Sequence, residues 1–142
     1  MPTYPISFSM PPEKIVEKIP EKTRIVAHII PGNLSTYIYD SEESYYQGYK
    51  ESFFGITMKK GGWDCMRHYE ILGNYCMPYF IGLEDCPKNT LFNFPKELLL
   101  EAKNIAENFD ETKYFSILDA VYKHTLNNLT TKSIAEYIIK NI

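Results

Sequence analysis

The middle of the chain alternates between apolar and polar segments in a way that predicts a strand, a helix and a second strand. Residues 52–57 form a short apolar run that ends in a polar loop containing two glycines. Apolar positions then recur at helical spacing over residues 65–74, with Asp64 at the expected N-cap, and residues 76–81 are apolar again. A strand, a crossover helix and a strand predict parallel strands joined by a right-handed connection.

The part of the chain before this unit contains fewer regular patterns. Residues 23–30 are rich in β-branched side chains and are followed by the turn sequence Pro31-Gly32-Asn33, which predicts a buried central strand. Residues 4–10 alternate, and because Pro5 cannot donate to a ladder, we expect an edge strand there. A short helix over residues 13–18 and a further strand over residues 35–39 complete the predicted elements of this part.

Helices are expected on both sides of the central unit. Residues 41–51 open with Ser-Glu-Glu, which predicts a helix with acidic residues in its first turn. Residues 95–108 carry an apolar stripe after a proline, and two more amphipathic helices are expected over 113–127 and 131–142. We therefore predict an α/β fold in which residues 1–142 form one domain, whose C-terminal part from about residue 95 is helical.

The charge and the cysteines narrow the classes of function. The chain of 142 residues has a net charge of −3, without the basic clusters that nucleic-acid binding requires. Its longest apolar runs are far shorter than the roughly 20 residues of a membrane span, and the first residues do not resemble a secretory leader. Three cysteines without a CxxC pair indicate reduced thiols. We expect a cytoplasmic protein with no membrane span and no nucleic-acid partner.

The loop between the first central strand and its helix has the composition of an anion-binding site. Its sequence is Lys59-Lys60-Gly61-Gly62-Trp63-Asp64, and it lies where open α/β sheets bind ligands. The helix N-terminus offers unpaired N–H groups, the glycines allow close backbone approach, and the lysines add positive charge. The loop matches neither the dinucleotide fingerprint nor the Walker sequence. A solvated basic loop is therefore the alternative interpretation.

Polar side chains continue along the predicted helix. Arg67, Glu70 and Asn74 are spaced three and four residues apart and share one helix face. Arg67 could bind a phosphate with two parallel hydrogen bonds, and Glu70 could accept hydrogen bonds from a ribose. The alternative is a surface ion pair between Arg67 and Glu70.

Several other patterns are open to two interpretations. The 12 tyrosines suit half-buried packing, and they also suit stacking on bases or sugars, as does Trp63. The spacing of Cys65, His68, Cys76 and Cys86 does not favour zinc, because structural zinc ligands come in tight pairs. We therefore expect no metal site.

The block from Lys59 to Leu72, which contains Arg67-His68-Tyr69-Glu70, is followed by Cys76-Met77-Pro78-Tyr79-Phe80. Together they resemble exostosin-like glycosyltransferases of the GT-B architecture, in the C-terminal Rossmann-like half that holds the nucleotide sugar. The stretch from about residue 23 to 95 is also similar to glycosyltransferase-like proteins of giant viruses and environmental sequences. The resemblance implies one half of a GT-B fold, a nucleotide-sugar donor as substrate, and no separate cofactor.

The resemblance also implies roles for particular residues. Glu70 would hold the ribose of a UDP- or GDP-linked sugar, and Arg67 with the loop of residues 59–62 would face the diphosphate. Thr57 would lie beside that diphosphate. Transfer would be metal-independent, which agrees with the lack of a DxD triplet in the chain. The complete set of expected binding residues is Thr57, Lys59, Lys60, Gly61, Gly62, Trp63, Asp64, Arg67 and Glu70.

The chain departs from the GT-B pattern at two points. A second acidic residue that many such enzymes carry would fall at Pro78, so the contact to the sugar is unassigned. The catalytic base is also unassigned, because these enzymes usually place it with the acceptor on an N-terminal domain for which this chain has no room. As the donor half of a longer or split enzyme, the chain would need an acceptor-binding N-terminal domain or a partner chain. Two alternatives therefore accompany the donor-binding interpretation. One is a non-catalytic binding or assembly module, and the other is a phosphate-binding domain unrelated to sugar transfer.

Overall fold

The computed structural model describes residues 2–142 and contains a three-stranded parallel sheet. The strands are β1 (Arg24–Val26), β2 (Ser52–Met58) and β3 (Met77–Ile81), in the order β1-β2-β3. Phe54 of β2 pairs with both neighbours, opposite Val26 on one side and Met77 on the other. The expected α/β class with a Rossmann-like parallel sheet and C-terminal helices is confirmed.

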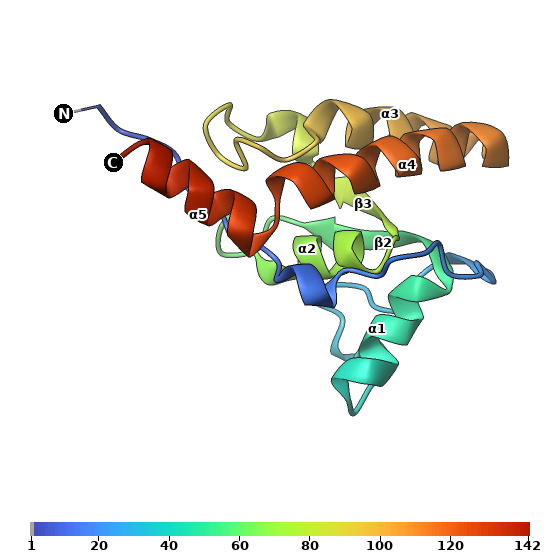
Figure 1. Cartoon of the computed structure of the whole chain (residues 1–142). Helices are drawn as coiled ribbons and strands as arrows, with labels where there is room; N and C mark the ends of the chain where they lie inside the picture. Colours follow the sequence, from blue (N-terminus) through green and yellow to red (C-terminus); the bar gives the residue numbers. More distant parts are fainter. Residues whose placement is uncertain (1) are drawn as a thin grey trace.

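Helices cover both faces of the sheet (Figure 1). On one side lie α1 (Glu42–Lys50) and α2 (Met66–Gly73), and on the other lie α3 (Lys96–Glu107) and α4 (Glu111–Asn128). The last helix, α5 (Thr131–Lys140), extends away from these layers, beside the N-terminal segment. Three short 3₁₀ helices complete the elements, at Pro12–Lys14, Leu34–Thr36 and Leu83–Asp85.

Helices α1 and α2 pack closely on β2, the central strand of the sheet. Gly55 of β2 lies directly under α1 and α2, and a Cβ atom built there would be 3.1 Å from both Ile71 and Tyr49. The missing side chain thus allows both helices to approach the strand closely. Pro78 fits because β3 is an edge strand, where a missing backbone donor costs no ladder hydrogen bond on the open side.

Three predictions for the first 40 residues are wrong. Residues 4–10 form no strand, and only Met10 makes an isolated bridge, to Thr130. The expected buried strand over 23–30 shortens to β1, an edge strand whose three residues are all exposed. Residues 34–36 form a 3₁₀ turn in place of a strand, because Asn33 and Thr36 satisfy backbone groups within that loop.

The exposure of β1 follows from what packs against it. Helix α3 covers the sheet over β3 and leaves an apolar cavity of about 240 Å³ beside β1. This cavity is lined by Ile25, Val26, Phe54, Ile56, Tyr79, Ala106 and Glu107. Side chains become buried only after the strand ends, at Ala27 and Ile29. The β-branched composition of this segment therefore predicted the strand but not its burial.

None of the helices in the described part of the chain has the length and apolar character that crossing a bilayer requires.

Candidate functional site

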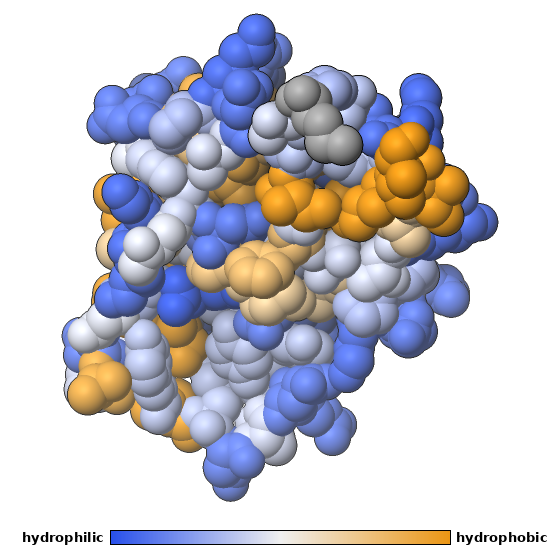
Figure 2. Space-filling model, turned by 90° about the vertical axis from the view of Figure 1, so that its left-hand side faces the viewer, coloured by the Kyte–Doolittle hydropathy of each residue, from blue (hydrophilic) through white to orange (hydrophobic). Residues whose placement is uncertain are grey.

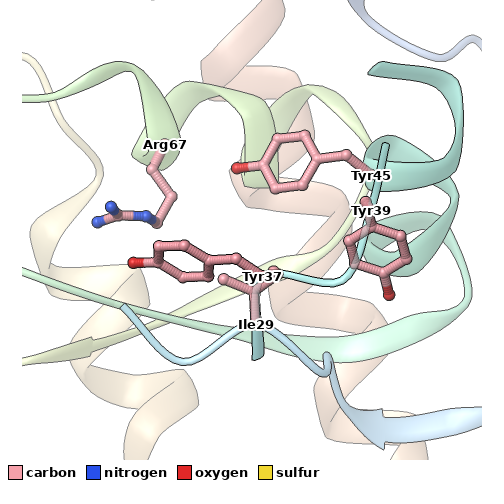
Figure 3. Close-up of a pocket in the computed structure, with 5 residues that line it drawn as sticks. All are labelled: Ile29, Tyr37, Tyr39, Tyr45 and Arg67. Atoms are coloured by element: carbon pink, nitrogen blue, oxygen red, sulfur yellow. The ribbon is translucent and has the colours of Figure 1, made fainter. Parts of the chain in front are cut away.

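A pocket of about 240 Å³ opens beside the N-terminal end of α2, and side chains from several segments meet in it (Figure 3). Ile29 comes from the loop after β1, Tyr37 and Tyr39 from the segment before α1, Tyr45 from α1, and Arg67 from α2. The pocket therefore lies where chain segments leave the carboxyl end of the sheet, which is where open α/β sheets bind ligands.

The loop that carries Tyr37 is fixed by its own hydrogen bonds. The Ile30 backbone N–H donates to Thr36 Oγ1 over 3.0 Å, and the Thr36 hydroxyl donates to the Asn33 carbonyl over 2.7 Å. The Gly32 N–H donates to the Tyr37 hydroxyl over 2.8 Å. The Tyr37 oxygen is thus held as an acceptor, and its own O–H remains available to donate into the pocket.

Arg67 is the charged group of the pocket. It is the second residue of α2, and in Figure 3 its guanidinium lies on the side toward which the rings of Tyr37 and Tyr45 extend. Nη1 of Arg67 is buried and has no hydrogen-bond partner among the described residues. A buried N–H donor without a partner costs about 1–3 kcal/mol, so this arrangement favours a ligand that accepts from it.

Glu70 is engaged within the protein. The Tyr45 hydroxyl donates to Glu70 Oε2 over 2.7 Å and lies 3.4 Å from the Tyr49 hydroxyl. Burial raises the pKa of Tyr45 well above its usual range, with the Tyr49 hydroxyl and the Glu70 carboxylate adding to the effect. Tyr45 therefore stays protonated and keeps donating to Glu70. Arg67 and Glu70 form no ion pair within residues 2–142, so the alternative interpretation of these two residues as a surface ion pair is not observed.

Thr57 and His68 form a second polar group, which is buried and contacts the loop of residues 59–64 at the Trp63 carbonyl. The imidazole of His68 is fully buried, with Nδ1 2.8 Å from Thr57 Oγ1 and Nε2 2.7 Å from the Trp63 carbonyl. Because the carbonyl can only accept, Nε2 carries the proton and Nδ1 accepts from the Thr57 hydroxyl. Burial lowers the pKa of His68, so the ring is neutral. Thr57 thus lies in the interior and anchors the loop through His68.

The loop of residues 59–64 is exposed at its centre and fixed at its end. Lys59, Lys60, Gly61 and Gly62 are exposed, and the Lys59 ammonium lies 5.4 Å from the centre of the Trp63 ring. The ring of Trp63 in turn stacks on Phe80 of β3, so this residue is a packing anchor of the loop.

Lys60 connects this loop to the pocket. A Cβ atom built on Gly32 would be 2.8 Å from Lys60 Nζ, so the ammonium lies against the loop that carries Tyr37. Lys60 therefore adds positive charge next to the loop whose Gly32 N–H donates to the Tyr37 hydroxyl. Of the expected diphosphate-binding residues, Arg67 lines the pocket, and Lys60 lies beside the loop that carries Tyr37.

Asp64 does not cap α2 as expected. Cys65 is the N-cap residue and makes no side-chain capping bond, while Asp64 Oδ2 accepts a hydrogen bond of 2.9 Å from the Phe8 backbone N–H. The competing partner lies 56 residues earlier in the chain, so local sequence could not reveal it. Asp64 therefore attaches the N-terminal segment to the start of α2.

The residues of the pocket that sequence reasoning missed are Ile29, Tyr37, Tyr39 and Tyr45. The abundance of tyrosine was the available signal, because three of these four residues belong to the tyrosine-rich stretch between residues 37 and 49. Hydrogen-bond donors and aromatic rings dominate the lining, and the described residues hold no cluster of three or more His, Cys, Asp or Glu side chains that could bind a metal ion.

The chain was compared with protein-family models, with curated proteins and with solved structures, and no significant match was found in any of the three comparisons.

Proposed function

We propose that the chain binds a nucleoside diphosphate sugar as the donor-binding domain of a glycosyltransferase, with the nucleotide in the pocket of Arg67. The observation that carries this proposal is the buried Nη1 atom of Arg67, for which the described residues supply no partner, in a pocket otherwise lined by tyrosines and Ile29. A guanidinium binds phosphate oxygens with two parallel hydrogen bonds, and tyrosine rings stack on bases and sugars. The resemblance to exostosin-like glycosyltransferases supports the same ligand.

The roles of the residues follow the geometry. Arg67 binds the phosphate nearest the pocket, and Lys60 extends the positive charge toward the second phosphate. The O–H of Tyr37 donates to the same group or to the ribose, and Glu70 holds Tyr45 in place as a wall of the pocket. Thr57 contributes indirectly, because it fixes the His68 ring that holds the loop. In transfer, Arg67 and the N-terminal end of α2 stabilise the departing diphosphate.

The test is calorimetric titration of the wild type with UDP, GDP and their glucose and mannose conjugates. We expect Arg67→Ala to raise the Kd of the bound nucleotide about 10- to 100-fold, the loss that removal of a buried charged hydrogen bond causes. Lys60→Ala should raise it by only about 2- to 5-fold, because an exposed charge contributes less.

The matched control is Arg24→Ala, which removes the other arginine of the chain at an exposed position of β1. It should leave the Kd unchanged. If the folded wild type binds none of these nucleotides, or if Arg67→Ala binds them as tightly as the wild type does, the proposal is wrong. Titration with inorganic pyrophosphate separates a nucleotide site from a general phosphate site, since pyrophosphate should bind much more weakly than the nucleotide.

Binding without transfer is the second candidate function. The observation that favours it is the pocket lining of tyrosines, isoleucine and arginine, which are groups that bind and orient a ligand. Release of free sugar or of a glycosylated acceptor from a nucleotide sugar would support the enzyme, whereas nucleotide binding without either product would support the binding module. For both candidates we propose a cytoplasmic location, of a host cell if the chain is viral, in keeping with its three free cysteines.

A further inference from the structure

A second cavity, of about 550 Å³, lies where the loop after β3 meets the start of α3 and the C-terminal half of α4. Figure 2 views the molecule from the side of this loop, the yellow loop at the left of Figure 1, and shows apolar patches among hydrophilic side chains. His124 of α4 forms part of the wall, and its Nε2 donates to the Asn93 carbonyl, so the ring is held in place. The apolar part of the wall consists of Phe92, Phe94, Pro95 and Leu98. The volume is that of a site for a small organic molecule.

Two lysines give this cavity a positive charge, in a chain whose net charge is −3. The Lys96 ammonium uses all three of its donors on carbonyl oxygens of the loop, over 3.1, 3.5 and 2.6 Å to Pro87, Lys88 and Thr90. The Lys88 side chain is exposed and takes part in no ion pair within residues 2–142. Glu97, also exposed, is the one acidic residue of the described lining. The cavity therefore has one cation fixed by the loop and one that is available to an anion.

The start of α3 adds hydrogen-bond donors to the same cavity. Its N-cap residue, Pro95, makes no side-chain capping bond. The backbone N–H groups of Glu97 and Leu98 have no hydrogen-bond partner within residues 2–142, and both residues line the cavity. Such N–H groups favour negative charge. An anionic group therefore fits at this end of the cavity, with the apolar wall beside it.

We propose that this cavity binds a small organic anion, with one carboxylate or phosphate group beside Lys88 and the start of α3 and an aromatic body against Phe92 and Leu98. The cavity and its charge carry the proposal together. An inorganic anion would leave the apolar wall uncovered, and a cationic ligand would be repelled by the two lysines. The proposal concerns other residues than the pocket of Arg67 and does not depend on it.

Titration of the ¹⁵N-labelled full chain with phenyl phosphate or benzoate, followed by two-dimensional NMR, tests the proposal. We expect the amide signals of Glu97 and Leu98 to shift with a Kd near about 1 mM, a typical affinity for ligands of this size. Benzylamine, which has the ring with a positive charge, should not shift them. Inorganic phosphate, which lacks the ring, should bind at least about tenfold more weakly. Binding of either aromatic anion at these amides supports the proposal, whereas shifts confined to the pocket of Arg67 overturn it.

Two variants of exposed side chains should change the affinity in opposite directions without affecting the fold. Lys88→Glu reverses the available cation and should raise the Kd about 5- to 10-fold, and Glu97→Gln removes the acidic group and should lower it about 2- to 3-fold. The control is Lys113→Glu, an exposed position about three turns from His124 along α4, which should leave the Kd unchanged. The proposal is wrong if about 10 mM of either anion shifts neither amide, if benzylamine binds equally well, or if Lys88→Glu leaves the Kd unchanged.

Discussion

Arg67 and His68 are neighbours in sequence, both in the first turn of α2, yet their side-chain nitrogens differ in hydrogen bonding. Both ring nitrogens of His68 are used, one toward Thr57 and one toward the Trp63 carbonyl, in a fully buried position. Nη1 of Arg67 is buried and has no hydrogen-bond partner within residues 2–142. An unpaired buried donor costs stability. We therefore infer that His68 stabilises the fold, whereas Arg67 serves a ligand.

Replacing His68 should have the largest effect. We expect His68→Ala to lower the free energy of unfolding by about 2–4 kcal/mol, because Thr57 Oγ1 and the Trp63 carbonyl lose their partner and a cavity remains under the loop. Urea denaturation followed by circular dichroism measures this. His28→Ala, at an exposed position, is the control and should change stability by less than about 0.5 kcal/mol.

The same histidine gives the wild type an acid sensitivity. Its pKa is lowered in the folded state, so the unfolded chain takes up the proton first as the pH falls below about 6.5, and stability decreases there. The loss should be smaller in His68→Ala. If His68→Ala is as stable as the wild type at neutral pH, His68 does not stabilise the fold and the contrast with Arg67 is wrong.

Lys22, at the opposite end of the sheet from the pocket, is a second largely buried cationic side chain, and unlike Arg67 it is hydrogen-bonded. Its ammonium donates to the carbonyls of Lys50 and Tyr75, and burial lowers its pKa to about 8. The unfolded chain therefore binds more protons above pH 8, and the free energy of unfolding should rise by about 1–2 kcal/mol between pH 8 and 9.5. A neutral amine still has two N–H donors for the two carbonyls, so the structure is retained.

Denaturation at a series of pH values, on the wild type and on Lys22→Met, measures this contribution. The rise should be absent in the variant. Measurements should stop near pH 9.5, because burial raises the pKa values of Tyr45 and Tyr114 above their unfolded values, and stability then falls as the unfolded tyrosines ionise. A rise of equal size in Lys22→Met would show that other groups cause it.

The smallest effect on stability should come from Arg67. Arg67→Met keeps the apolar stem and removes the unpaired buried donor, so the free energy of unfolding should stay the same or increase by up to about 1 kcal/mol. Thermal and urea denaturation without ligand measure this. A loss of more than about 2 kcal/mol would mean that Arg67 serves the fold as His68 does, and the basis for the proposed ligand site would be lost.

The sequence predicted the parts of the fold that depend on local pattern. The apolar run of β2, the helical spacing of α2 and the Ser-Glu-Glu start of α1 all mark elements that the structure confirms. The burial of β1 could not be predicted in this way, because α3 covers the sheet over β3 and leaves Ile25 open. Burial depends on the neighbouring element, which lies some 70 residues later in the chain.

The candidate site was also predicted only where local sequence carries the signal. Arg67 and Lys60 were identified because charge, glycine and a helix start are visible in sequence. Tyr37 was missed, because its place in the pocket depends on the turn that Asn33 and Thr36 build, where a strand was expected. The spacing of Glu70 also does not reveal that Tyr45, 25 residues earlier, donates to its carboxylate.

Gly55 determines how closely the two helices that line the pocket approach strand β2. The two helices that rest on this backbone position carry opposite walls, Tyr45 on α1 and Arg67 on α2. A single methyl group at Gly55 would act as a wedge, moving Ile71 and Tyr49 outward by a few tenths of an ångström together with their helices. The width of the opening therefore depends on the strand beneath the two helices, and a larger residue at Gly55 would widen it for a larger ligand while leaving every lining side chain unchanged.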